Sequence, residues 1–201
     1  MKIVWLLFYF VVLIWSAIGP KDYFTWFLEV FPALIGLIAI ALTYKRFRLT
    51  PLTYFLILVH CIILMIGGHY TYAEVPLFNW IRDTFNMTRN NYDKVGHLAQ
   101  GFIPAVIARE LLLRLEIITK RGWLAFIVVC ICLAISAFYE LIEWWAALLS
   151  GKAAEAFLGT QGYIWDTQSD MAIALLGAIL ALVLLSKTHD SQIKKIARIM
   201  T

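Results

Sequence analysis

The stretch DKVGHLAQ, Asp93–Gln100, opens a segment that is long enough to cross a bilayer but carries several charged or polar side chains. On a helix, Asp93, His97 and Gln100 follow an i, i+4, i+7 spacing, which places them on one face. A charged group at bilayer depth costs about 2.5–3.5 kcal/mol on insertion scales, so it normally faces a partner or a wet cavity. The stretch therefore predicts a membrane helix whose polar face meets other helices or trapped water.

The composition around this stretch is that of a membrane protein. The chain has 201 residues, of which 62% are hydrophobic and 15% are charged, and its mean hydropathy is +0.81. Ordinary soluble domains carry about 25% charged residues. Because one span needs about 20 residues, the chain has room for about six or seven transmembrane helices and none for a separate soluble domain.

Six apolar segments predict a single domain, residues 1–201, built as an all-α polytopic bundle of six transmembrane helices. The predicted spans cover residues 3–18, 24–44, 52–68, 92–112, 123–145 and 166–186. Residues 69–91 are too polar to span, and Leu77, Ile81 and Phe85 recur at helical spacing, which predicts an amphipathic helix in the outer interface. Residues 146–165 contain three glycines and are expected to form a lid or re-entrant loop on the same side.

Basic residues are divided unequally between the two sides of this arrangement. Eleven lie on the side that holds both chain ends: Lys2, Lys45, Arg46, Arg48, Arg114, Lys120, Arg121, Lys187, Lys194, Lys195 and Arg198. Five lie on the other side: Lys21, Arg82, Arg89, Lys94 and Lys152. The positive-inside rule therefore predicts cytoplasmic termini and polar clusters at the outer face. Because the basic residues form no single stripe, the net charge of +4 indicates topology and not nucleic-acid binding.

Two further polar clusters lie at the outer ends of the last two predicted spans. Glu140 and Glu143 are three residues apart and share a helix face, with Tyr139 beside them. Asp166 and Asp170 are four residues apart and also share a face. A stripe of small residues follows them and allows close helix approach: Ala174, Gly177, Ala178 and Ala181. We expect these carboxylates to meet the first cluster in one hollow beneath the outer surface.

Carboxylates packed that closely cannot all stay ionised without cations. Bound protons, pairing with basic side chains such as Lys94, or a divalent metal ion would each restore the balance. Oxygen ligands with one imidazole suit Mg²⁺, Mn²⁺, Ca²⁺ or Zn²⁺. The candidate catalytic and metal-binding residues are Asp93, His97, Glu140, Glu143 and Asp170. The candidate substrate-binding residues are Arg82, Arg89, Gln100, Tyr139, Asp166 and Gln168.

Each cluster also has a purely structural interpretation. Asp93 would be a polar helix start stabilised by the helix dipole, and Asp166 would be only a helix N-cap. Glu140 and Glu143 would form an interhelical hydrogen-bond network. Glu29, one turn inside the second span, would be a single interfacial polar residue of a common kind.

Other polar residues within the spans are expected to be structural. His60, in mid-span, is expected to be a satisfied core histidine. Arg109 and Glu110 lie close to the inner interface and are expected to snorkel or to form a structural pair. The three cysteines, Cys61, Cys130 and Cys132, lie in apolar runs and are expected to be small buried hydrophobes.

Three motifs carry a resemblance to a known family. They are NYDKVGHLAQGFIPA at residues 91–105, YELIEWW at 139–145 and FLGTQGYIWDTQSDM at 157–171. Together they resemble the YjdF-type family of small bacterial inner-membrane proteins of uncharacterised activity. More distantly, Asp93 with His97, the pair Glu140 and Glu143, and Asp170 resemble the VanZ-like group, which is linked to glycopeptide resistance. Both resemblances imply a multi-pass protein of the bacterial cytoplasmic membrane with an outward-facing site.

The leading functional hypothesis is an enzyme or binder embedded in the lipid bilayer that acts on the polar headgroup of a lipid or lipid-linked molecule. The candidate catalytic residues would either hold a divalent cation or share acid–base work, with His97 as the group most able to titrate near neutral pH. Two alternatives remain open. One is a small proton- or cation-coupled transporter, since acids within membranes also mark ion pathways. The other is an accessory structural membrane protein.

Overall fold

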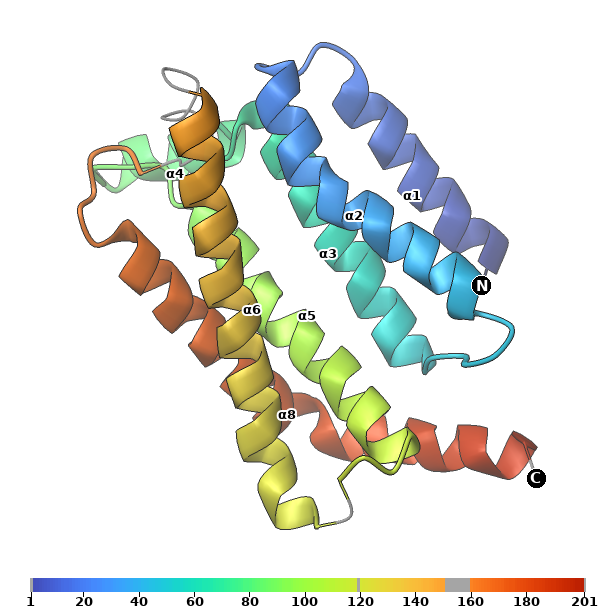
Figure 1. Ribbon diagram of the computed structural model, residues 1–201. Coiled ribbons are helices and arrows are strands. Elements are labelled where there is room, and N and C mark those ends of the chain that lie inside the picture. The colour runs from blue at the N-terminus through green and yellow to red at the C-terminus, as the bar shows by residue number, and fades with distance from the viewer. Residues whose placement is uncertain (1, 119, 151–159, 201) are drawn as a thin grey trace.

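The computed structural model describes residues 2–118, 120–150 and 160–200, and within these ranges every regular element is a helix. Figure 1 shows their arrangement as a membrane-type bundle. The helices are α1 (Lys2–Ala17), α2 (Tyr23–Thr43), α3 (Pro51–Tyr70), α4 (Pro76–Thr84), α5 (Tyr92–Arg114), α6 (Arg121–Ser150) and α8 (Asp166–Met200). The predicted all-α class is confirmed.

The long helices correspond one by one to the six predicted spans. Four are long and apolar enough on their own to cross a bilayer: Tyr23–Thr43, Pro51–Tyr70, Gly122–Leu149 and Asp166–Ala197. Helix α1 is apolar but shorter. Helix α5 is long but carries the DKVGHLAQ stretch at one end and several charges at the other, so its polar groups must be covered by protein.

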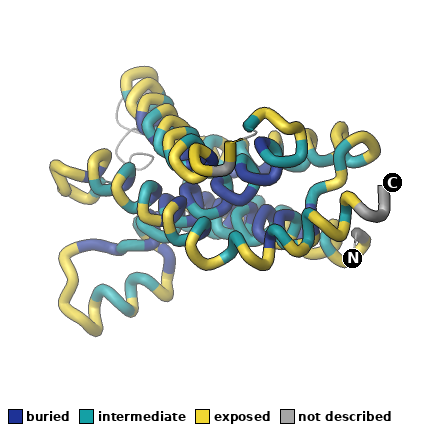
Figure 2. Tube along the Cα trace, turned by 90° about the horizontal axis from the view of Figure 1, so that it is seen from below, coloured by how far each residue is buried: buried dark blue, intermediate teal, exposed yellow. Residues whose placement is uncertain are grey.

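Helix α5 lies at the centre of the bundle and supplies that cover. It packs against α3, α6 and α8, and 13 of its 23 residues are buried. Figure 2 shows the buried segments gathered in the middle of the bundle, with exposed turns along the outer helices. Many large apolar residues point outward, such as Ile3, Leu42 and Val183, as acyl-chain surroundings require.

Helices α5 and α8 cross at backbone contact. A Cβ atom added to Gly101 would lie 1.7 Å from the carbonyl oxygen of Ala174, and one added to Gly177 would lie 2.3 Å from that of Leu98. Ala174 and Ala178 are completely buried. The predicted small-residue stripe is confirmed, and the crossing fixes the start of α8 beside the start of α5.

The amphipathic helix predicted between the third and fourth spans is α4. None of its residues is buried, and Leu77 and Trp80 are exposed, as expected for a helix lying in the interface. Asn90 ties this helix to the start of α5, because its side-chain amide donates to the Asn79 side chain at 2.9 Å and to the Val75 carbonyl at 3.1 Å.

Three details differ from the sequence-based expectations. Residues 146–150 are helical and extend α6, and residues 151–159 of the expected lid lie outside the described residues. Helix α8 continues well beyond residue 186 because its tail docks on α3, where the Gln192 side chain accepts from the Leu52 backbone N–H at 2.9 Å. Cys130 is exposed on α6, so its assignment as a buried residue was wrong, whereas Cys61 and Cys132 are buried.

Candidate functional site

The three predicted polar clusters converge on one buried region, at the end of the bundle that is predicted to face outward. We call it the outer cluster after that prediction and define it by nine residues: Glu29, Arg89, Asp93, Lys94, His97, Glu140, Glu143, Asp166 and Asp170. All of them except the partly buried Lys94 are buried. They come from α2, α5, α6, α8 and the segment before α5, so helices distant in sequence build the region together.

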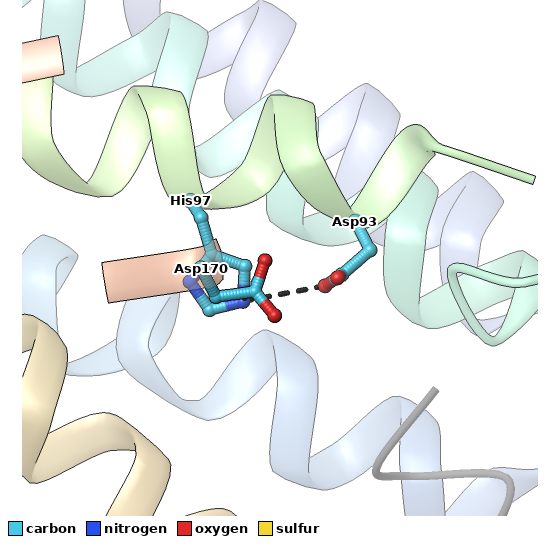
Figure 3. Close-up of side chains that lie close together, drawn as sticks. All are labelled: Asp93, His97 and Asp170. Carbon is cyan, nitrogen blue, oxygen red and sulfur yellow. Dashed lines mark ion pairs between the residues drawn. The ribbon is translucent and has the colours of Figure 1, made fainter. Parts of the chain in front are cut away.

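His97 lies between carboxylates on three helices. Its Nε2 atom is 3.3 Å from Asp93 Oδ1 and 3.9 Å from Asp170 Oδ1. Its Nδ1 atom is 3.1 Å from the Gln100 side-chain oxygen and 3.8 Å from Glu140 Oε1. Figure 3 shows the side chains of Asp93, His97 and Asp170 directed toward one another. The i, i+4, i+7 spacing on α5 therefore produces one polar face, as predicted.

The basic residues of the outer cluster gather on its α8 side. Lys94 Nζ lies 2.7 Å from Asp166 Oδ1 and 2.5 Å from Asp170 Oδ1. Arg89 lies 2.5 Å from Asp166 and 3.5 Å from Asp93. The ring of Tyr163 lies under both cations, 5.6 Å from the Arg89 guanidinium and 5.8 Å from Lys94 Nζ. Positive charge is thus concentrated at the outer rim.

The deeper carboxylates lack this compensation. Among the described residues, no lysine or arginine nitrogen lies within ion-pair distance of Glu29, Glu140 or Glu143. Glu29 accepts a hydrogen bond from the Tyr139 hydroxyl at 3.1 Å. The buried Oε1 atom of Glu140 accepts none. Leaving a buried polar atom unpaired costs about 1–3 kcal/mol, and more when it is charged, so this half of the cluster favours a bound proton, cation or ligand.

A cavity of about 150 Å³ adjoins two of these acids, Glu29 and Glu143. Its polar wall includes Glu29, Asp93, His97, Tyr139 and Glu143. Two prolines, one on α2 and one on α5, line it further inside: Pro32 and Pro104. A proline lacks the N–H that would bond the carbonyl four residues earlier, so Pro104 adds a freed backbone acceptor near Gln100. The cavity can hold water or a small polar group beside the carboxylates.

Two predicted substrate-binding residues lie outside the outer cluster. Arg82 is on α4 and pairs with Asp83 at 2.8 Å, and its hydrogen bond lowers the pKa of that exposed carboxyl. Gln168 is exposed on α8. The other four predicted binding residues lie in the cluster or contact it: Arg89, Gln100, Tyr139 and Asp166.

Two residues interpreted as structural line the cavity instead. Glu29 was expected to be a lone interfacial acid, and its spacing to Pro32 on the same face of α2 was the available signal. His60 is only half-buried, and no described residue hydrogen-bonds its ring, so it is not a satisfied core histidine. Nothing in its apolar neighbourhood on α3 distinguishes it in the sequence.

A second buried polar group, which we call the inner cluster, lies at the other end of α5. Its residues are Thr50, Thr53, Arg109, Glu110, Arg114, His189 and Asp190. The completely buried Glu110 carboxylate accepts from the Thr50 backbone N–H at 2.8 Å, the Thr53 hydroxyl at 2.6 Å and Arg114 at 2.6 Å. His189 Nε2 lies 3.2 Å from the same carboxylate.

Arg109 does not snorkel, contrary to one of the two expectations for it. This residue is buried and lies 2.6 Å from Asp190 and 3.2 Å from His189 Nδ1, both on α8. Arg109 and Glu110 therefore have a structural role, but each is bound to α8 and not to the other. The partners were not recognisable in the sequence, because they lie about 80 residues away from α5.

Comparison with known proteins agrees with the motifs. Residues 1–191 match the family model described as "Predicted membrane protein (DUF2238)". The chain is also 50% identical over 184 residues to the inner membrane protein YjdF of Escherichia coli (strain K12), which covers 92% of this chain and 88% of that protein. No solved structure matches. The YjdF-type resemblance is confirmed, the VanZ-like one finds no support here, and this membrane protein belongs to the DUF2238 family.

Proposed function

We propose that the outer cluster binds a divalent cation and acts on the polar headgroup of a lipid or lipid-linked molecule. One observation carries the proposal. Asp93, His97 and Asp170 each offer a ligand atom, and these atoms all lie within 4.8 Å of one another. The two helices that supply them are held in backbone contact at Gly101 and Gly177, so the ligands are pre-positioned rather than borne on loops.

The charge balance of the outer cluster supports a cation. Six carboxylates face two permanently basic side chains and one histidine. Like charges at this separation in a buried volume disfavour one another's ionised forms. A divalent ion held by Asp93, His97 and Asp170 would add two positive charges to this excess of carboxylates. The ligand set of oxygens and one imidazole suits Mn²⁺, Mg²⁺ or Zn²⁺.

Lys94 is the internal competitor for such a cation. Its ammonium group lies 2.5 Å from Asp170, but it also contacts Asp166 at 2.7 Å and the Ser169 hydroxyl at 2.9 Å. Lys94 Nζ also lies 3.6 Å from Asp93. When a metal ion takes Asp93 and Asp170, Lys94 keeps two of its four partners, Asp166 and Ser169, and remains at the outer rim to meet an anionic headgroup.

The surrounding groups suit work on a phosphorylated or hydroxylated headgroup. A cation at Asp93, His97 and Asp170 would polarise an oxygen of the ligand. Glu143 and Tyr139, across the cavity, would exchange protons with it. Arg89 would orient an anionic group at the rim. In this assignment the whole chain forms one domain with cytoplasmic termini and an outward-facing site. The name of the Escherichia coli relative supports the inner-membrane location.

Metal retention tests the proposal. Purified protein in lipid nanodiscs is equilibrated with Mn²⁺ and desalted. The bound Mn²⁺ is then quantified by elemental mass spectrometry. We expect about one Mn²⁺ per chain, with affinity about tenfold or more weaker in His97→Ala and Asp170→Asn. His69→Ala is the control, because His69 contacts the Ser16 carbonyl at 3.0 Å, outside the outer cluster. Wild-type protein that retains no more metal than His97→Ala would contradict the proposal.

A small proton- or cation-coupled transporter is the second candidate. The excess of buried acids over bases favours it, because acids within membranes also mark ion pathways. Proteoliposomes separate the two functions. Uptake of Mn²⁺, or proton flux that is lost in Asp93→Asn, would support transport, whereas binding without flux would support the headgroup site.

A further inference from the structure

A second, larger cavity continues from the outer cluster toward the inner side of the membrane. It has a volume of about 520 Å³ and lies between α2, α3 and α5. Apart from Thr43, His60 and Cys61, its lining side chains are apolar. We call it the apolar groove. It runs along α2 from Pro32 to Thr43, a distance of about 16 Å at 1.5 Å per residue.

The apolar groove and the polar cavity share one boundary. Pro32, His60 and Leu64 line both of them. A molecule placed with its polar end beside Glu29 and Glu143 can therefore continue into the groove past these three residues. A polar cavity next to an apolar groove is complementary to an amphiphile, whose headgroup would lie in the polar cavity and whose chain would lie in the groove.

The wall on α2 leaves room for such a chain. A Cβ atom added to Gly36 would meet nothing within 4 Å, although this glycine lines the groove. Its neighbours on the same wall are also small, namely Ala33 and Ala39. The groove length of about 16 Å is about half the 30 Å hydrocarbon thickness of a bilayer, which is the depth that one acyl chain occupies in its leaflet.

From this geometry we infer that the substrate class is an intact phospholipid, with one acyl chain lying in the apolar groove and the headgroup in the outer cluster. The inference rests on the proposed function for the headgroup end and, for the chain end, on the adjoining cavities that share Pro32, His60 and Leu64. It excludes a water-soluble headgroup alone as the ligand, because such a molecule would leave the groove unused. The groove also gives the site a way to select ligands by their chain.

Photolabelling tests the chain position directly. The probe is a phosphatidylethanolamine with a diazirine near the end of one acyl chain, mixed into vesicles of phosphatidylethanolamine and phosphatidylglycerol that hold the full-length protein. After illumination, adducts are mapped by peptide mass spectrometry at Ile107 in the groove and at Phe126, an exposed residue on the outside of α6. We expect adducts at Ile107 to exceed those at Phe126 by about tenfold, the equivalent of ~1.4 kcal/mol.

Matched phenylalanine substitutions locate the effect. Gly36→Phe fills the groove and should bring the two adduct yields to parity. Ile38→Phe, on the lipid-facing side of the same helix, where Ile38 is exposed, should leave the excess unchanged. If Gly36→Phe does not fold, Ala39→Phe, one turn deeper on the groove wall, serves the same purpose.

The Mn²⁺ count on these proteins separates this inference from the proposed function. Excess labelling at Ile107 that Gly36→Phe abolishes while Mn²⁺ is retained supports the groove as the chain site. Equal labelling at Ile107 and Phe126 in the wild type shows ordinary surrounding lipid and overturns the inference, as does an excess that survives Gly36→Phe. Failure of the wild type to retain Mn²⁺ counts against the proposed function alone.

Discussion

The two ends of α5 bury charge in opposite ways. In the inner cluster, five polar atoms contact the Glu110 carboxylate, and no buried side-chain nitrogen or oxygen of this cluster lacks a partner among the described residues. In the outer cluster, carboxylates outnumber bases, Glu140 Oε1 is unpaired, and a cavity adjoins the acids. A completed network holds helices together, whereas an incomplete one is prepared for a ligand.

Removing charge from the inner cluster should have the largest effect. Glu110→Gln removes the carboxylate that pairs with Arg114 and contacts His189, and it leaves the Arg114 guanidinium without its carboxylate partner. Breaking a buried ion pair in this way costs about 3–5 kcal/mol. Chemical unfolding in detergent, followed by circular dichroism, measures this cost. A loss of less than about 1 kcal/mol in the free energy of unfolding would show that the inner cluster contributes no more than surface ion pairs do. The two clusters would then not differ in their contribution to stability.

The α5–α8 crossing should respond next. Gly101→Ala forces a Cβ atom against the Ala174 backbone, and overpacking of this kind costs about 1–3 kcal/mol. Because the same crossing positions Asp170 beside His97, metal retention should fall together with stability. Gly122→Ala is the matched control, since a Cβ atom there meets nothing within 4 Å. Equal behaviour of the two variants would show that the crossing does not position the site.

Much of the outer cluster was predictable because its signal is local. The spacing of Asp93, His97 and Gln100 lies within one helix, and the small residues from Ala174 onward predict the close approach of α8. The inner cluster was not predictable, because Thr53 and His189 are 136 residues apart and meet only after folding. Each of its members is unremarkable at its own place in the sequence.

The cavities were not predictable for a different reason. The polar cavity is lined by α2, α3, α5 and α6 and the apolar groove by α2, α3 and α5, and no residue type marks empty space. In the sequence, His60 is one histidine in an apolar run, and Gly36 is one small residue in an apolar segment. Only the arrangement of the helices shows that both residues line hollow regions.

Asp22 is a carboxylate outside both clusters, and it shows how much a single hydrogen-bonded helix cap contributes to stability. Asp22 caps α2 by accepting from the Thr25 backbone N–H at 2.7 Å, and this hydrogen bond lowers its pKa below the ordinary 3.8. Its contribution is therefore complete well above pH 3.8 and is lost as the pH falls through the lower folded value. Asp22→Ala should cost about 1 kcal/mol at neutral pH.

The same measurement at two pH values checks this cap. At a pH below the folded pKa of Asp22, the free-energy difference between wild type and Asp22→Ala should be smaller, because the protonated carboxyl oxygen still accepts a hydrogen bond but no longer carries a charge. A cost that is independent of pH would show that the charge of Asp22 does not contribute to the cap.

Neutralising the outer cluster should have the smallest effect on stability and the clearest effect on binding. Glu140→Gln keeps the shape of the side chain and removes one excess negative charge, so the free energy of unfolding should stay within about 1 kcal/mol of the wild type or rise. Mn²⁺ retention should weaken. The variant is the direct counterpart of Glu110→Gln, and destabilisation of equal size in both would mean that the two clusters are alike.

The most direct test of the central claim is the unfolding of wild-type and His97→Ala protein with and without Mn²⁺. A ligand that binds only the folded state at 100 times its dissociation constant stabilises it by about 2.7 kcal/mol. A cation site in the outer cluster predicts a stabilisation of this order for the wild type and, because the affinity is about tenfold or more weaker, at most about half of it for His97→Ala, while Glu110→Gln, although less stable, keeps the full increment. An unchanged wild-type curve, or an equal shift in His97→Ala, would contradict a cation site in the outer cluster.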